Sequence, residues 1–289
     1  MDGSPSWYLD AVVARQKRDV HQRWVRTVIA DRPCDAVLKT DIFEEAYGAD
    51  SIYNDLFPGA RLALGMDLNA TTVHTAARRH GAAFRTMVSD VRHLPLRPGS
   101  VDVVVSMSTL DHFASREDIA RSLDEIVRVL RPGGVLAITL DNPRNPTYHF
   151  VRWMTRFGWA PFELGETLSL SALRCMLSER GLRIEASAYL IHNPRGLSTM
   201  LFLTLRKALG RFANTPIRAL LTIFAAFDKL PSRSITGCFV AVGAVKEGGC
   251  WDSIEKPLTT LGESGASHRS PATQPPEPET RQAGSVPGT

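Results

Sequence analysis

Polar side chains that could hold a nucleotide follow three predicted strands of this chain. In an open α/β sheet, ligands bind beyond the carboxyl ends of the strands, where a carboxylate can accept hydrogen bonds from ribose hydroxyls. The strands are predicted at 61–66, 84–88 and 101–106, and the groups at their ends are Asp67, Asp90 and the stretch from Ser106 to His112. A helix cap for Asp67 and a turn for Asp90 are the alternatives for each residue taken alone.

Alternating strands and helices must position these side chains. The run VDVVV, starting at Val101, is β-branched and largely apolar, as expected of a central parallel strand buried on both faces. Further strands are predicted at 35–39, 135–140, 182–191 and 236–245, and helices at 6–31, 69–80, 116–130 and 169–180.

Short motifs between 34 and 142 resemble the class I methyltransferases that use S-adenosylmethionine. They are Ser89-Asp90-Val91, Leu94-Pro95, Ser100 to Val104, and EIVRVLRPGGVLAITL from Glu125 to Leu140. The resemblance implies an α/β fold: a Rossmann-like doubly wound seven-stranded sheet, mostly parallel with an antiparallel last strand. It implies S-adenosylmethionine as the cofactor.

The same resemblance implies roles for individual residues. Asp67 and Leu68 would lie at the ribose, Asp90 at the adenine amino group, and the Val91 backbone N–H at the ring. Ser106 would contact the cofactor. Asp111 and His112 are the candidates for acid/base catalysis, because an imidazole near neutrality could take a proton from an acceptor hydroxyl. Packing or helix capping is the alternative for His112.

The loop after the first strand departs from the family pattern. The expected acidic residue and glycine-rich turn are replaced by Lys39 and the residues up to Gly48. Side chains there prevent the close backbone approach that glycines allow. We expect Thr40 and Asp41 to contact the cofactor instead; the alternatives are a helix cap or a loop that binds nothing.

The composition of the chain limits which other classes of function are possible. The chain has 289 residues, a net charge of +4 and a pI of about 9.0. The basic residues are scattered, so no nucleic-acid partner is predicted. The four cysteines lack metal-type spacing, so we expect no metal and a reduced, cytoplasmic protein. Neither a signal peptide nor a spanning helix is predicted.

Three regions are expected: an N-terminal helix in 1–33, an α/β domain at 34–245, and a disordered tail at 246–289. The helix could pack on the sheet or form a lid. Within the domain, 196–231 reads as an inserted helical cap. It could cover an acceptor pocket, form a homodimer, or make a peripheral membrane contact, in that order of expectation.

The functional hypothesis is methyl transfer to a small or lipophilic metabolite. Aromatic residues between 148 and 162 could line the acceptor pocket or simply pack. The alternative is a non-catalytic binding or scaffold protein on the same fold, suggested by the loss of the glycine turn.

Overall fold

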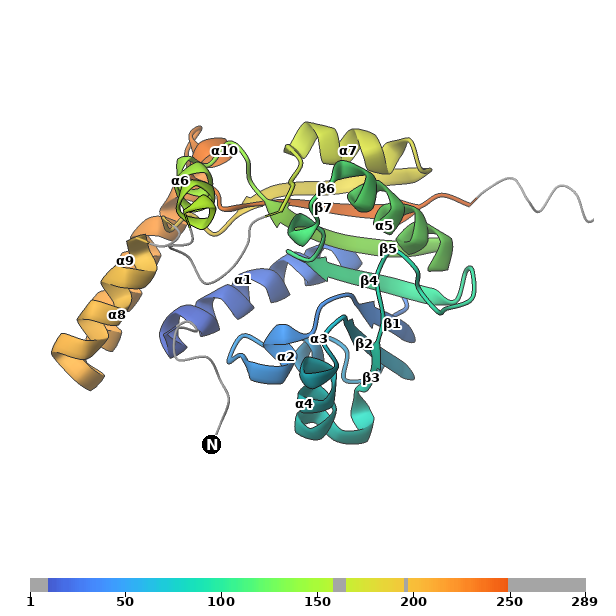
Figure 1. Cartoon of the computed structure of the whole chain (residues 1–289), viewed down its shortest axis with the longest axis horizontal. Helices are drawn as coiled ribbons and strands as arrows, with labels where there is room; N and C mark the ends of the chain where they lie inside the picture. The colour runs from blue at the N-terminus through green and yellow to red at the C-terminus, as the bar shows by residue number, and fades with distance from the viewer. Residues whose placement is uncertain (1–9, 158–164, 195–196, 249–289) are drawn as a thin grey trace, which may run out of the picture. The chain divides into compact units, whose positions relative to one another are not determined.

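The computed structural model describes residues 10–157, 165–194 and 197–248. Seven strands form one sheet in the order β3-β2-β1-β4-β5-β7-β6 (Figure 1). The strands are β1 (Ala36–Lys39), β2 (Leu62–Asp67), β3 (Arg85–Val88), β4 (Val101–Met107), β5 (Leu130–Asp141), β6 (Leu182–Leu190) and β7 (Phe239–Lys246). β7 runs antiparallel to both of its neighbours, β5 and β6, and the pairs from β3 to β5 are parallel. The predicted fold class is therefore confirmed.

Helices cover both faces of the sheet. They are α1 (Ala11–Ile29), α2 (Phe43–Tyr47), α3 (Tyr53–Leu56), α4 (Ala70–His80), α5 (Arg116–Val129), α6 (Pro146–Arg156), α7 (Leu170–Ser178), α8 (Leu197–Leu209), α9 (Asn214–Ala226) and α10 (Arg233–Thr236). On one face, α1 and α4 share an apolar core with Val103 and Val105. On the other face, α5 and α7 pack around Val104. The alternation of Val103, Val104 and Val105 between the two cores explains why β4 is buried throughout.

Local signals place the helices close to the predicted ranges. Asn69, Ser115 and Ser169 cap α4, α5 and α7 by accepting hydrogen bonds from backbone N–H groups of the first turn. The strand predicted at 135–140 begins earlier, at Leu130, so the Pro132-Gly133-Gly134 segment lies within β5. Of the helix predicted at 6–31, residues 6–9 lie outside the described residues, as does the predicted tail from 249 onward.

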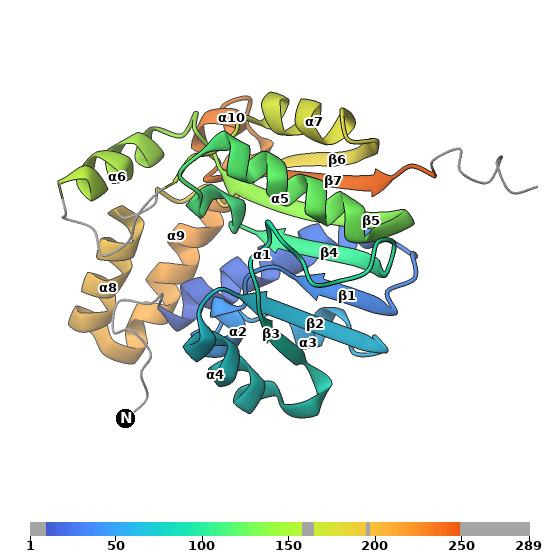
Figure 2. The ribbon, with the colours of Figure 1, turned by 45° about the vertical axis from the view of Figure 1, so that its right-hand side comes forward.

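Three helices lie on the side of the sheet where the parallel strands end. α6 follows β5, and α8 and α9 follow β6; Figure 2 shows all three beyond the carboxyl ends of the strands. Phe202 of α8 and Ile217 and Leu221 of α9 pack with Val13 of α1 in a small separate core. The predicted insertion is thus helical and anchored on the N-terminal helix.

Candidate functional site

The ends of β1 and β4 bring three hydroxyl groups together. Thr40 Oγ1 lies 3.0 Å from Ser106 Oγ and 3.0 Å from Thr109 Oγ1. The Thr40 backbone N–H donates to the Val105 carbonyl at 3.1 Å, which continues the pairing of the two strands. Thr40 and Ser106 are both buried. These two predicted cofactor residues therefore lie in direct contact at the strand edge.

Asp67 ends β2 with its side chain half-buried. Its carboxylate accepts a hydrogen bond from the Asn69 backbone N–H at 2.8 Å, while Asn69 itself caps α4. Burial raises the pKa of Asp67 above its ordinary value, although backbone N–H groups of Asn69 and Ile42 oppose the shift. Asp67 thus forms an Asx turn, and the capping of α4 falls to Asn69.

An apolar surface adjoins Asp67. Leu68 is 63% exposed, and Val88, which pairs with Asp67 across β2 and β3, is 53% exposed. Exposed aliphatic side chains beside a carboxylate suit a ligand that has a flat apolar ring and a hydroxylated sugar.

Asp90 is held by an arginine that the sequence reading did not single out. Arg92 donates from its guanidinium to both Asp90 oxygens, at 2.7 Å for the shortest contact, and also pairs with Asp118 at 2.9 Å. The hydrogen bonds from Arg92 hold the pKa of Asp90 below its ordinary value. The guanidinium lies 5.0 Å from the centre of the Phe113 ring. Val91 is buried in the core.

The loop after β1 contains a chain of alternating charges. Lys39 Nζ lies 2.7 Å from Glu45 Oε2 and 3.3 Å from Glu44 Oε2. Lys17 of α1 lies 3.1 Å from Glu44 and 2.8 Å from Asp50. Burial alone would lower the pKa of Lys39, but the three nearby acids raise it above its ordinary value. Lys39 and Glu45 therefore form a buried ion pair where the family has its glycine turn.

Asp41 lies beside this chain of charges. Its carboxylate accepts a hydrogen bond from the Phe43 backbone N–H at 2.8 Å, and its carbonyl accepts one from Lys39 Nζ. Burial, together with repulsion by Glu44, raises the pKa of Asp41 to about 7. Burial would also raise the pKa of Glu44, but Lys39 and Lys17 hold it well below its usual range. The loop thus carries the Glu44 carboxylate, whose pKa is lowered, and the Asp41 carboxylate, whose pKa lies near neutrality.

The turn after β4 is organised by Asp111. Its Oδ2 accepts hydrogen bonds from Ser108 Oγ at 2.8 Å and from the Asp141 backbone N–H at 2.7 Å, while its buried Oδ1 has no hydrogen-bond partner among the described residues. Ser108 has a φ of +52°, a strained conformation for serine. His112, next to Asp111, is exposed.

Gly165 and Glu166 are hydrogen-bonded to the turn that follows β4. Their N–H groups donate to the carbonyls of Asp111 and Phe113 at 3.0 and 2.7 Å. A Cβ on Gly165 would lie 2.3 Å from the Phe113 oxygen, so only glycine fits. These two hydrogen bonds place the chain after residue 165 beside His112.

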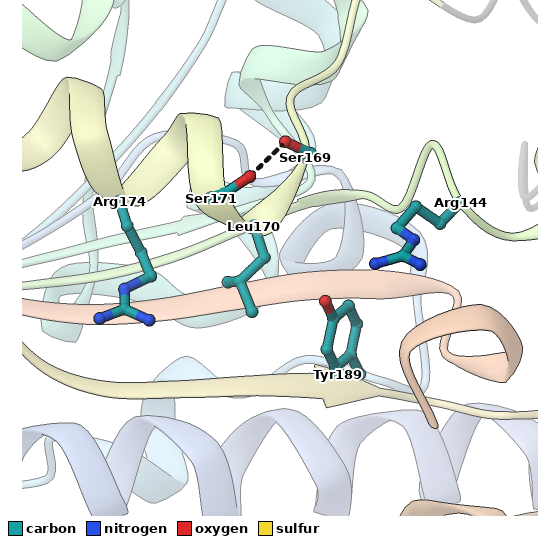
Figure 3. A pocket seen from close by; sticks show the side chains of 6 residues that line it. All are labelled: Arg144, Ser169, Leu170, Ser171, Arg174 and Tyr189. Atoms are coloured by element: carbon teal, nitrogen blue, oxygen red, sulfur yellow. Dashed lines mark hydrogen bonds between the residues drawn. The ribbon is translucent and has the colours of Figure 1, made fainter. Parts of the chain in front are cut away.

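A separate pocket of about 190 Å³ opens near the ends of β5 and β6 (Figure 3). Arg144 and Arg174 line it, and Leu170 and Tyr189 lie between them in this view. Within the described residues, neither guanidinium has an ion-pair partner. None of the nine predicted site residues lines this pocket.

Different residues at the carboxyl ends of the strands would meet the two halves of S-adenosylmethionine. Asp67, Leu68 and Asp90 provide the carboxylates and apolar surface that its adenosine half requires, at neighbouring strand ends. The methionine half would meet Asp41 and the Lys39–Glu44–Glu45 cluster instead of glycine backbone. Glu44 and Glu45 are already paired with Lys39, so the Asp41 carboxylate is the group of this loop that would face the cationic sulfonium and ammonium groups.

Comparisons with known proteins identify the fold and show a family match over part of the chain. Residues 46–138 match the family described as "Methyltransferase domain". A solved S-adenosylmethionine-dependent methyltransferase from Thermotoga maritima, described as a possible histamine N-methyltransferase, superposes with a TM-score of 0.53 at 14% identity, covering 81% of this chain and 92% of that one. The family match begins at residue 46, so the part of the unusual loop from Lys39 to Glu45 lies outside it.

Curated relatives match over shorter stretches. A probable S-adenosylmethionine-dependent methyltransferase of Mycolicibacterium smegmatis is 38% identical over 105 residues, 34% of this chain and 35% of the relative. A fatty-acid O-methyltransferase of that species is 31% identical over 122 residues, 42% and 38% of the two chains. The tRNA (carboxymethyluridine(34)-5-O)-methyltransferase ALKBH8 of Macaca fascicularis is 38% identical over 71 residues, 25% and 10%.

This chain thus spans about a third of the first of these relatives, and less of the tRNA enzyme. The family match spans the motifs at Asp90 and at Leu130 to Gly134. Residues 46–138 therefore match a methyltransferase domain, and the fold of the chain is that of solved S-adenosylmethionine-dependent methyltransferases.

Proposed function

We propose that this chain transfers a methyl group from S-adenosylmethionine to a small or lipophilic metabolite. The observation that carries the proposal is the position of Asp67, Leu68 and Asp90 at neighbouring strand ends, in a domain whose family uses this cofactor. Asp67 would accept hydrogen bonds from the ribose hydroxyls. Leu68 and Val88 would cover one side of the adenine ring, and Asp90 would accept a hydrogen bond from its amino group.

The bound cofactor supplies a methyl group already activated by its sulfonium. The chain then has to align the acceptor and exclude water, which is sufficient for a large rate enhancement. For an acceptor hydroxyl, His112 would take the proton at its imidazole. Asp111 would act as a positioning residue, since its carboxylate already holds Ser108 and the Asp141 backbone.

The lipophilic acceptor is supported by α6. Its side chains Phe150 and Trp153 are exposed, as is Phe157 just after it. Large exposed aromatic groups near a strand edge suit an apolar substrate. One relative is a fatty-acid O-methyltransferase, while another acts on tRNA, so the test must offer both classes.

The test uses S-adenosylmethionine labelled in its methyl group, the full chain, and separate lipid, small-metabolite and tRNA fractions of a bacterial extract. We expect label in the organic-soluble or small-molecule fraction, and none with an Asp67→Ala variant. Label in the tRNA fraction alone would refute the proposed acceptor class. Binding of the cofactor with no transfer to any fraction would count against catalysis.

A second candidate is a non-catalytic binding protein. The observation that favours it is the buried Lys39–Glu45 pair in place of the glycine turn. Under this alternative, Asp67→Ala and Asp90→Ala variants keep the biological activity of the chain, whereas an enzyme loses it.

A further inference from the structure

The hairpin of α8 and α9 has two apolar sides. Its inner side packs on α1 through Phe202, Ile217 and Leu221. A helix that buries one face normally turns a polar face to water. Here the outer side is also apolar, so packing within the described chain explains only one of the two.

The exposed apolar residues are large. Leu197 is 60% exposed, Met200 67% and Phe212 70%. The others on this segment are Leu201, Leu203, Leu209, Ile223, Leu230 and Ile235. On α8, Leu197 and Met200 lie roughly opposite Phe202 at 100° per residue, so they face away from the small core. A segment that exposes so many large apolar side chains is a candidate interaction surface.

The charge of the same segment indicates which kind of partner this surface fits. Between 197 and 236 the sequence has six Lys and Arg residues and a single acid, Asp228, so this segment is more positive than the whole chain at +4. Arg206 is paired with Asp10 at 2.7 Å. Lys207, Arg211 and Arg218 are exposed beside the apolar residues.

Arg211 and Phe212 show both properties at one point. The Arg211 guanidinium lies 5.0 Å from the centre of the exposed Phe212 ring. At a bilayer surface an aromatic ring enters the apolar boundary, while a neighbouring guanidinium reaches the headgroups.

We propose that the α8–α9 hairpin docks the protein on the surface of an anionic phospholipid bilayer. A second copy of this chain would bring the same positive charges together, which opposes association. Among the described helices, none is long and apolar enough to cross a membrane. α8 has 13 residues, about 20 Å of helix, against a hydrocarbon core of about 30 Å. The hairpin therefore lies in the plane of the interface. This docking does not depend on the methyl-transfer proposal.

The test is flotation of the full chain with phosphatidylcholine vesicles, with and without about 30 mol% phosphatidylglycerol. We expect binding to the anionic vesicles only, reduced at about 1 M salt because the headgroup attraction is screened. The double variant Leu197→Glu/Met200→Glu should lose binding at least about tenfold, and so should Lys207→Gln/Arg211→Gln. Arg78→Gln, on the exposed face of α4, is the control and should bind like the native chain.

Equal binding by the native chain and both double variants would overturn the proposal, as would an absence of vesicle binding. Light scattering supplies the remaining outcome. If the native chain is a dimer in solution and Leu197→Glu/Met200→Glu converts it to a monomer, this surface binds a second copy of the chain. That result would also overturn the proposal of bilayer docking. The two double variants alter different side chains, so misfolding of one, seen by circular dichroism, leaves the other as the test.

Discussion

Lys39 Nζ lies 2.7 Å from Glu45 Oε2, and both side chains are almost completely excluded from solvent. The pair occupies the turn that normally carries cofactor-binding glycines. Lys17 of α1 extends it to Glu44 and Asp50, so the N-terminal helix is tied electrostatically to the strand edge.

Removing one partner of this pair should destabilise the fold. Lys39→Met leaves Glu45 buried without its cation, and breaking a buried pair costs about 3–5 kcal/mol of unfolding free energy. Urea denaturation measures it. The double variant Lys39→Met/Glu45→Gln should recover part of the loss, because neither charge is then left alone. Lys229→Met, at an exposed lysine, is the control. A loss below about 1 kcal/mol in Lys39→Met would show that the pair does not hold this loop.

Asp41 should make stability depend on pH. Its pKa is about 7 in the folded chain against an ordinary 3.8, so the folded state binds the extra proton between these values. Stability from this group is therefore complete below about pH 4 and is lost as the pH rises to about 7. Asp41→Asn should remove this component and be more stable than the native chain at pH 8, by about 1 kcal/mol or more.

Urea unfolding at pH 5 and pH 8 checks this expectation. The quantity to compare is the difference in unfolding free energy between the native and Asp41→Asn chains. Glu44, whose pKa is lowered, is present in both chains and makes their stability depend on pH in the opposite direction. A difference that is the same at both pH values would contradict the raised pKa of Asp41.

Substitutions at Asp111 and His112 should affect different properties, stability for Asp111 and kcat for His112. Asp111→Ala removes the carboxylate that accepts from the Asp141 N–H and the Ser108 hydroxyl and should cost about 1–3 kcal/mol of stability. His112→Gln, at an exposed position, should leave stability within about 0.5 kcal/mol while lowering kcat for a hydroxyl acceptor. Thermal unfolding and a kcat–pH profile distinguish them. Unchanged kcat in His112→Gln would remove His112 as the base.

The sequence predicted the framework well because its signals are local. Val101 to Val105 is β-branched and apolar on both faces, and Asn69, Ser115 and Ser169 are capping residues beside amphipathic helices. Each element could therefore be placed within a few residues. The strand ends at Asp67, Asp90 and Ser106 follow from the parallel order that the resemblance implied.

The contacts of the site could not be predicted, because they join distant segments. Lys17 reaches Glu44 and Asp50 only once α1 is packed on the sheet. Asp111 looked like a candidate acid or base, yet its carboxylate binds the Asp141 backbone 30 residues away. Arg92 was the exception that nearby sequence could have revealed, since it lies two residues from Asp90.

Titration calorimetry with S-adenosylmethionine and its demethylated product tests the central claim most directly, using the native chain, Asp67→Asn, and Asp19→Asn as a surface control. We predict that the native chain and Asp19→Asn bind both compounds, and that Asp67→Asn binds at least about tenfold more weakly, or about 1.4 kcal/mol, with an unchanged unfolding midpoint. Failure of the native chain to bind either compound, or equal binding by Asp67→Asn, would contradict an adenosine site at this strand edge.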